Sequence, residues 1–248
     1  MNGDTIRLAI LDVDGCLTPG EAQPWDFDVL AYVRALNRRA RTGEPVPAVT
    51  LCTGRQEPYV EVLMQAIDAY LPGIFENGCG LYFPDGYRFV LHPSISTEAR
   101  QALFRARSTL QREVADAKLG YFQPGKEASL TLYPLPGITV RALYRAIQAV
   151  LGNERDLFTL RESASCVDLT PHGVDKGAGV RWLSEETGIP LAQMGGVGDS
   201  TSDLEFLRLV GRSAAPANAT GPVRAAVEYV SPHADGQGVV DILEHWTR

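Results

Sequence analysis

The chain has 248 residues, 45% of them hydrophobic and 21% charged, which is typical of a globular protein with one large domain or two smaller ones. Its net charge of −7 argues against a nucleic-acid-binding protein, because phosphate backbones require clustered lysine and arginine side chains. No apolar run reaches transmembrane length, the N-terminus has no signal-peptide pattern, and the four cysteines show no zinc or disulfide spacing. We therefore expect a cytoplasmic protein that does not bind membranes.

An apolar run over residues 8–11 leads directly into two aspartates, Asp12 and Asp14, followed by a glycine. The run is short and rich in branched side chains, which predicts a buried strand. The spacing of two residues on an extended chain tends to aim both carboxylates the same way, where they repel each other unless a cation compensates. Two carboxylates that merely cap the next loop are the alternative.

The next elements alternate between helix and strand. Apolar residues at helical spacing predict one helix over residues 26–39 and another around residues 60–67. Residues 46–52 and 74–75 are predicted strands, and the first of them ends at Thr53-Gly54-Arg55. This βαβαβ order predicts a parallel sheet with covering helices.

The pattern changes over residues 83–168, which we interpret as a smaller α/β domain inserted between residues 1–82 and 169–248. A Pro-Asp-Gly turn at 84–86 joins two strands, and a long helix follows Ser96 or Thr97. The remaining predicted elements are a strand over 129–135, a helix over 139–152, and strands over 158–161 and 166–169.

The alternation then resumes and predicts a doubly wound, Rossmann-like parallel sheet as the core of the α/β fold. A helix begins at 175–177, and a short strand over 194–198 leads into Asp199 and Asp203. The last predicted elements are a helix through 204–210, a strand from 212, a helix over 222–228, a strand at 229–230 and a helix from 238.

Three further polar groups join Asp12 and Asp14, and each follows a strand end or begins a helix. Thr53 and Gly54 offer a hydroxyl and backbone donors, and Lys176 places a cation at a helix N-terminus. Asp199 and Asp203 add two carboxylates. Such a set fits a divalent cation and a phosphoryl group. Taken singly, each has a structural alternative: a turn, a surface lysine, or a helix cap.

The segments DVDGCLT (12–18), TGR (53–55) and GDSTSD (198–203), together with Lys176, resemble the four motifs of the haloacid dehalogenase superfamily. The insert is similar in place and length to a type II α/β cap, in particular that of the IIB branch, which contains phosphosugar and phosphoglycolate phosphatases and phosphomannomutases. Two positions depart from the family pattern: Cys16 commonly is threonine and Ser202 commonly is asparagine. Both support the acidic residues.

The resemblance implies that Asp12 is the nucleophile and forms an aspartyl-phosphate, while Asp14 is the general acid and base. It implies that Thr53, Gly54 and Lys176 hold the phosphoryl oxygens. Arg55, which lies beside the end of a predicted strand, is a further candidate substrate ligand, and a structural role is the alternative. It also implies Mg²⁺ as cofactor, bound by Asp12, the Asp14 main-chain carbonyl and Asp199, with Asp203 orienting these ligands.

We therefore expect a Mg²⁺-dependent phosphatase for a small phosphorylated metabolite, a sugar phosphate or a phosphoglycolate-like acid. A phosphomutase and a non-catalytic phosphosugar-binding regulator are the alternatives, and the sequence leaves open whether the chain forms a homodimer. Asn77 and Asn218 lie beside strand ends and are candidates for lining the pocket. In the insert, the candidate specificity residues are Lys126, Arg161 and Asp168.

Overall fold

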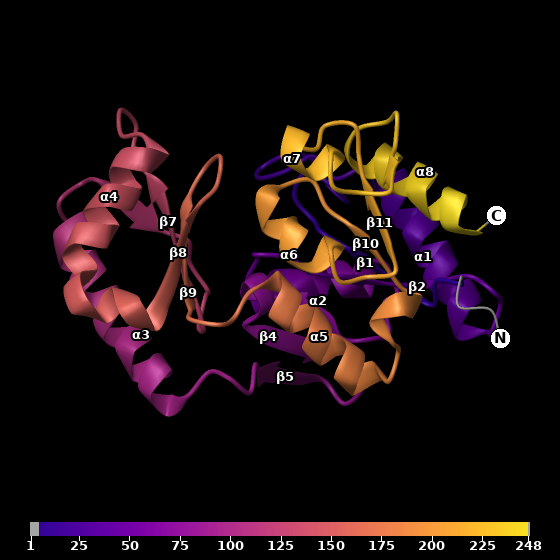
Figure 1. The fold of residues 1–248 in the computed structure, drawn as a ribbon, viewed down its shortest axis with the longest axis horizontal. Coiled ribbons are helices and arrows are strands. Elements are labelled where there is room, and N and C mark those ends of the chain that lie inside the picture. The colour runs from indigo at the N-terminus through magenta and orange to yellow at the C-terminus, as the bar shows by residue number, and fades with distance from the viewer. Residues whose placement is uncertain (1–4, 248) are drawn as a thin grey trace. The chain divides into compact units, whose positions relative to one another are not determined.

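The computed structural model describes residues 5–247 and divides them into two compact units (Figure 1). Unit 1 contains the chain up to Val90 and from Asp175 onward, and unit 2 contains Leu91–Val174. The domain limits expected from the sequence lie close to these, at 82/83 and 168/169, and their outer residues 1–4 and 248 lie outside the described part. Each unit is described by itself below.

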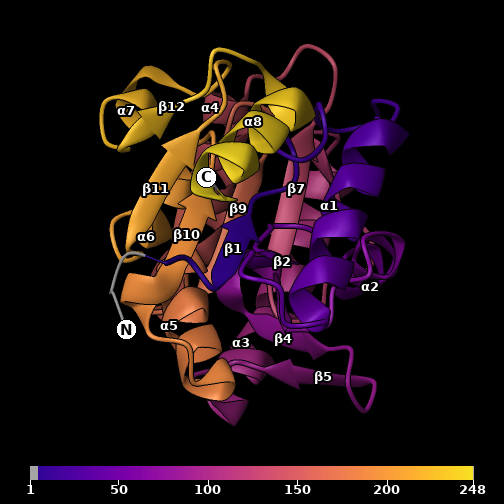
Figure 2. The same ribbon diagram turned by 90° about the vertical axis from the view of Figure 1, so that its right-hand side faces the viewer.

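Unit 1 is built on a parallel sheet of five strands. These are β1 (Leu8–Leu11), β2 (Ala48–Leu51), β10 (Met194–Val197), β11 (Arg212–Ala215) and β12 (Tyr229–Val230). Their order is β12-β11-β10-β1-β2 (Figure 2), so the apolar run that begins the chain is an inner strand, buried along its whole length. The predicted parallel α/β sheet is confirmed.

Helices cover both faces of this sheet (Figure 1). On one face, α1 (Phe27–Arg41) packs against α8 (Asp235–Thr247), and on the other α5 (Lys176–Thr187) packs against α6 (Leu204–Leu207). The helices on the two faces approach β10 closely at two adjacent glycines. A Cβ on Gly195 would lie 2.6 Å from Trp246 of α8, and one on Gly196 would lie 2.8 Å from Phe206 of α6. The short helix α7 (Gly221–Arg224) and α2 (Glu57–Ala66) complete the unit.

The third predicted strand, expected to extend the parallel sheet, pairs mainly with β4 in a second sheet. β3 (Gly73–Phe75) is joined to the end of β2 only by a bridge between Cys52 and Ile74, and it pairs antiparallel with β4 (Gly80–Phe83) in a second sheet that ends with β5 (Arg88–Leu91). Positive φ angles at Glu76, Asn77 and Gly78 turn the chain back at once. β3 is therefore too short to form a full parallel ladder.

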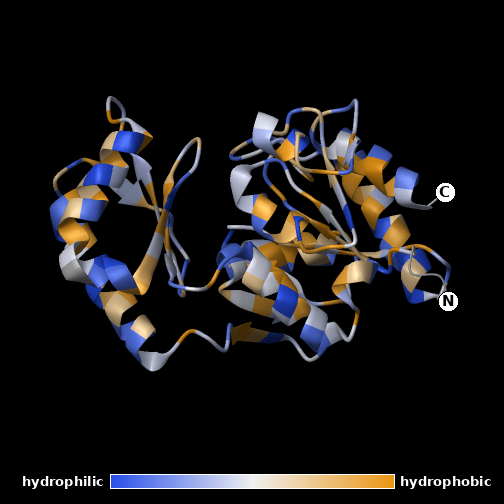
Figure 3. Cartoon of the chain, viewed as in Figure 1, coloured by the Kyte–Doolittle hydropathy of each residue, from blue (hydrophilic) through white to orange (hydrophobic). Residues whose placement is uncertain are grey.

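Unit 2 is a four-stranded antiparallel sheet with two helices. The strands β6 (Gly120–Phe122), β7 (Leu130–Pro134), β8 (Phe158–Glu162) and β9 (Val167–Pro171) lie in the order β6-β7-β9-β8. The helices α3 (Thr97–Leu110) and α4 (Val140–Leu151) share an apolar core with the sheet, and both are banded with hydrophobic and hydrophilic residues (Figure 3). Strand β6 was not predicted, because three residues are too few for a period-two pattern.

Within residues 5–247, no helix combines the length and the apolar character that crossing a membrane requires.

Candidate active site

The candidate residues of unit 1 lie just beyond the ends of three adjacent parallel strands. In the register of the sheet, Leu11 is opposite both Leu51 and Val197, so β1, β2 and β10 end at the same level. The backbone N–H of Asp12 donates to the Val197 carbonyl at 2.9 Å, which extends this ladder by one residue. The expected common edge of the sheet is present.

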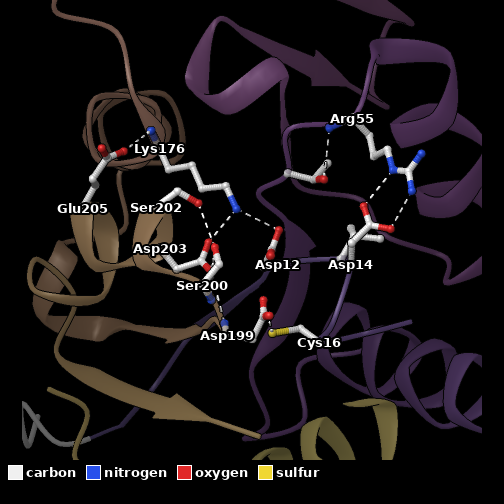
Figure 4. Close-up of polar contacts among 12 residues, drawn as sticks. Asp12, Asp14, Cys16, Arg55, Lys176, Asp199, Ser200, Ser202, Asp203 and Glu205 are labelled. Carbon is white, nitrogen blue, oxygen red and sulfur yellow. Dashed lines mark hydrogen bonds and ion pairs between the residues drawn. The ribbon is translucent and has the colours of Figure 1, made fainter. Parts of the chain in front are cut away.

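Lys176 lies between two of the candidate carboxylates (Figure 4). Its Nζ donates to Asp12 Oδ1 at 2.8 Å and to Asp203 Oδ1 at 2.5 Å, and all three side chains are almost completely buried. α5 begins at Lys176 because Asp175 caps it, accepting from the N–H of Ala178 at 2.7 Å. A residue 164 positions away from Asp12 thus supplies its counterion.

Asp203 is the anchor of the loop that carries Asp199. Its Oδ2 accepts from the backbone N–H groups of Asp199 and Ser200, at 3.1 and 2.9 Å, and from Ser200 Oγ at 3.0 Å. A Cβ on Gly198 would lie 2.4 Å from Asp203 Cβ, so only glycine fits there. Both carboxylate oxygens of Asp203 are therefore occupied, which suits an orienting residue better than a metal ligand.

The sequence patterns did not identify two further residues that support the site, Ser200 and Glu205. Ser200 forms a reciprocal capping box with Asp203, and its Ser-x-x-Asp spacing was the available signal. Glu205 accepts from the N–H of Lys176 at 3.3 Å, and no pattern in the sequence indicates this contact.

The buried cluster contains more negative than positive charge. Burial, followed by repulsion from Asp203, raises the pKa of Asp12 well above its ordinary value, and the same two causes raise the pKa of Asp199 to about 6. Burial alone would lower the pKa of Lys176, but Asp12 and Asp203 raise it, so the lysine stays charged. The single ammonium of Lys176 does not balance the three carboxylates of Asp12, Asp199 and Asp203, so a further cation would stabilise the cluster.

The loop after β1 approaches Asp199 closely. Gly15 has φ of +84°, and a Cβ there would lie 2.6 Å from Asp199 Oδ2. Cys16 Sγ donates to Asp199 Oδ1 at 3.8 Å, and burial together with Asp199 raises the pKa of this thiol, so it remains a proton donor. Asn218 donates to the Gly15 carbonyl at 2.8 Å and so supports this loop.

Asp14 does not share the environment of Asp12. Its carboxylate is bound by Arg55, with Nε 2.7 Å from Oδ2 and Nη2 2.6 Å from Oδ1 (Figure 4). Strand β1 ends at Leu11, and a turn closed by the N–H of Cys16 donating to the Val13 carbonyl follows. Asp12 and Asp14 therefore have different cationic partners, Lys176 and Arg55.

Thr53 and Gly54 form a tight turn after β2. Thr53 Oγ1 accepts from the N–H of Arg55 at 3.1 Å, and its carbonyl accepts from the N–H of Asn77 at 2.9 Å. A Cβ on Gly54 would lie 2.9 Å from Asn77 Oδ1. Asn77 therefore supports this turn.

The three candidate specificity residues lie together in unit 2. Lys126 donates to Thr131, and its Nζ lies 3.6 Å from Asp168 Oδ1. Thr131 of β7 and Arg161 of β8 both face Asp168 of β9 in the register of the sheet.

The residues present fit a hard divalent cation. Ligand atoms of Asp12, Cys16 and Asp199 lie within 4.8 Å of one another, and carboxylate oxygens are preferred ligands of Mg²⁺. The excess negative charge around them is the second observation that agrees with such an ion. Thiol sulfur is a poor ligand for Mg²⁺, which suits Cys16 as a donor to Asp199.

Comparison with known proteins agrees with this geometry. Residues 140–243 match a family of haloacid dehalogenase-like hydrolases. The chain is 27% identical to phosphoglycolate phosphatase 1 of Saccharolobus solfataricus, over 96% of this chain and 95% of that one, and 26% identical to an HMP-PP phosphatase of Enterobacter, over 97% and 95%.

Solved structures share the fold. A Thermoplasma acidophilum protein has a TM-score of 0.76 at 23% identity, covering 98% of both chains. A sugar phosphatase of haloacid dehalogenase subclass IIB has a TM-score of 0.70 at 16% identity, covering 97% of this chain and 98% of that one. With the four motifs at one edge of a parallel sheet, the chain is an enzyme similar to the phosphatases of the haloacid dehalogenase superfamily.

Proposed function

We propose that the chain is a Mg²⁺-dependent phosphomonoester hydrolase that forms an aspartyl-phosphate, an acyl phosphate, on Asp12. The observation that carries this proposal is the buried arrangement of Asp12, Lys176 and Asp203, in which a carboxylate at a strand end is held by a lysine within a cluster of excess negative charge. Such a group is oriented for attack on a phosphorus atom.

A small phosphorylated metabolite is the proposed substrate. Relatives along the whole chain are named phosphoglycolate phosphatases, and a structural neighbour is named a sugar phosphatase. The insert that forms unit 2 has the place along the chain of a cap domain, and we propose that it limits the size of the substrate.

In the first step, a carboxylate oxygen of Asp12 attacks the phosphorus atom and the bond from phosphorus to the alcohol oxygen breaks. Asp14 donates its proton to that oxygen, so the alcohol leaves neutral. Lys176 binds Asp12 Oδ1 and adds positive charge where the phosphoryl oxygens gather. The hydroxyl of Thr53 and the N–H of Gly54 are the proposed donors to the same oxygens.

In the second step, water attacks the phosphorus atom of the acyl phosphate on Asp12, and the bond from phosphorus to the Asp12 oxygen breaks. Asp14, now ionised, accepts a proton from this water, and inorganic phosphate leaves as Asp12 regains its carboxylate. The residues thus return to their starting protonation states.

The proposed Mg²⁺ ligands are Asp12, the Asp14 main-chain carbonyl and Asp199, with Asp203 holding the loop of Asp199. When bound, the ion neutralises the negative charge that Asp12 and the phosphate bring together. Gly15 and Cys16 shape and orient the Asp199 carboxylate from the opposite side.

Phosphate release from phosphoglycolate and a panel of sugar phosphates, with Mg²⁺ and with EDTA, tests the proposal. We expect release that requires the metal and is lost in Asp12→Asn, while Asp85→Asn, an exposed aspartate in the β4–β5 turn, is unaffected. Mass spectrometry of Asp14→Asn after mixing with substrate should find one phosphoryl group on the Asp12 peptide.

No release from any member of the panel, or undiminished release in Asp12→Asn, would contradict the proposal. Turnover that depends on an added sugar bisphosphate would identify a phosphomutase instead.

A further inference from the structure

Arg55 occupies both oxygens of the Asp14 carboxylate. The two contacts, 2.7 Å from Nε to Oδ2 and 2.6 Å from Nη2 to Oδ1, form a parallel bidentate pair. Such a pair fixes the plane of the carboxylate as well as its distance, because the guanidinium donors are rigidly spaced. The side chains of Arg55 and Asp14 are only 16% and 27% exposed, so water competes weakly for these bonds.

Both the guanidinium and the backbone of Arg55 are held in place by contacts within unit 1. Its guanidinium lies over the ring of Tyr59 at 4.9 Å, and Tyr59 packs edge-on against Trp25 at 5.8 Å. Its backbone N–H donates to Thr53 Oγ1 at 3.1 Å, and its carbonyl accepts from the N–H of Glu76 at 2.9 Å. The guanidinium is therefore preorganised by contacts that do not involve a substrate.

We propose that Arg55 is a positioning residue that acts on the reaction through Asp14, rather than a ligand of the substrate phosphate. This inference rests on the proposed function, in which Asp14 protonates the leaving alcohol. The bidentate pair holds the ionised carboxylate, so Asp14 takes up the proton that it donates when it releases at least one bond to Arg55. Arg55 sets the orientation from which Asp14 then reaches the leaving group. The competing role is the direct phosphate contact expected from the sequence.

The two roles predict different dependence on the leaving group. An alkyl phosphate such as phosphoglycolate needs a general acid, because its alcohol is a poor leaving group, whereas p-nitrophenyl phosphate needs little protonation. The ratio kcat/KM reports the steps up to release of the alcohol. A residue that acts through Asp14 should matter for the first substrate only, and one that binds phosphate should matter for both.

The experiment measures kcat/KM for both substrates in the wild type, Arg55→Gln, Asp14→Asn and the double variant. We expect Arg55→Gln to lose about 10- to 100-fold with phosphoglycolate and less than about threefold with p-nitrophenyl phosphate. In the Asp14→Asn background, Arg55→Gln should cause no further loss, because residues acting as a unit are not additive. Arg38→Gln, which breaks an exposed pair with Asp68, is the matched control and should retain wild-type values.

An equal loss with both substrates, or a further loss in the Asp14→Asn background, overturns the inference and assigns Arg55 to phosphate binding. If the wild type has no phosphatase activity, the proposed function itself is refuted. The wild-type measurement thus separates failure of the proposed function from failure of the inference about Arg55. Arg55→Lys keeps the charge but cannot form two parallel bonds. It should give an intermediate loss confined to phosphoglycolate, and it decides the question if Arg55→Gln does not fold.

Discussion

Replacing Lys176 with methionine should destabilise unit 1 strongly at alkaline pH and much less in acid. The substitution nearly keeps the length of the side chain but removes the ammonium that binds Asp12 and Asp203, which are 6% and 0% exposed. Removing one partner of a buried ion pair leaves an uncompensated charge and costs about 3–5 kcal/mol. We expect a loss of this size at about pH 8, measured without added metal.

The loss should shrink in acid because the folded state then neutralises its own carboxylates. The pKa of Asp199 is about 6, and that of Asp12 is also raised, so both bind protons more tightly in the folded protein than in the unfolded chain. Protonation therefore favours the folded variant as the pH falls below about 6. At about pH 5 the cost should fall toward the roughly 1–3 kcal/mol expected for unsatisfied hydrogen-bonding groups.

Urea unfolding followed by tryptophan fluorescence is the assay. The three tryptophans, Trp25, Trp182 and Trp246, all belong to unit 1, so the signal reports that unit. The control is Arg208→Met, which removes an exposed cation of unit 1 and should change stability by less than about 0.5 kcal/mol. A loss below about 1 kcal/mol at pH 8, or the same loss at both pH values, would refute the reasoning about the buried charges.

Three further predictions concern the same cluster. The rise in the pKa of Asp199 from 3.8 to about 6 on folding should by itself cost the metal-free wild type at most about 3 kcal/mol of stability between about pH 4 and pH 7. Mg²⁺ should restore this stability, and unfolding with and without the ion checks it. Gly15→Ala should raise the Mg²⁺ concentration for half-maximal activity about tenfold or more, since its Cβ collides with Asp199, whereas Gly20→Ala, also at positive φ but in open space, should not. Asp203→Asn should weaken Mg²⁺ binding about 10- to 100-fold in calorimetric titration, because an amide cannot accept from all four donors; unchanged binding would show that Asp203 does not orient the Asp199 loop.

Most elements were predictable because their apolar residues follow simple periods. The central strand at 8–11 and the helices that begin after Asp26, Ser96 and Thr139 are examples, and Ser96 caps its helix as expected. The short strand β6 and the antiparallel pairing of β3 with β4 were not predictable. Three-residue strands contain too few side chains for a pattern, and tight turns rather than periodicity direct them.

The sequence by itself determined which residues meet at the edge of the sheet, because strand ends of a parallel α/β fold converge and the motifs mark them. Asp12, Thr53 and Asp199 are placed by this rule alone. It could not determine how their side chains pair. Only the tertiary structure decided that Lys176 lies between Asp12 and Asp203 and that Asp14 binds Arg55. It also decided that both carboxylate oxygens of Asp203 accept hydrogen bonds from neighbouring groups. These contacts join residues far apart in the chain or within turns, where the orientation of a side chain depends on packing and not on any repeat in the sequence.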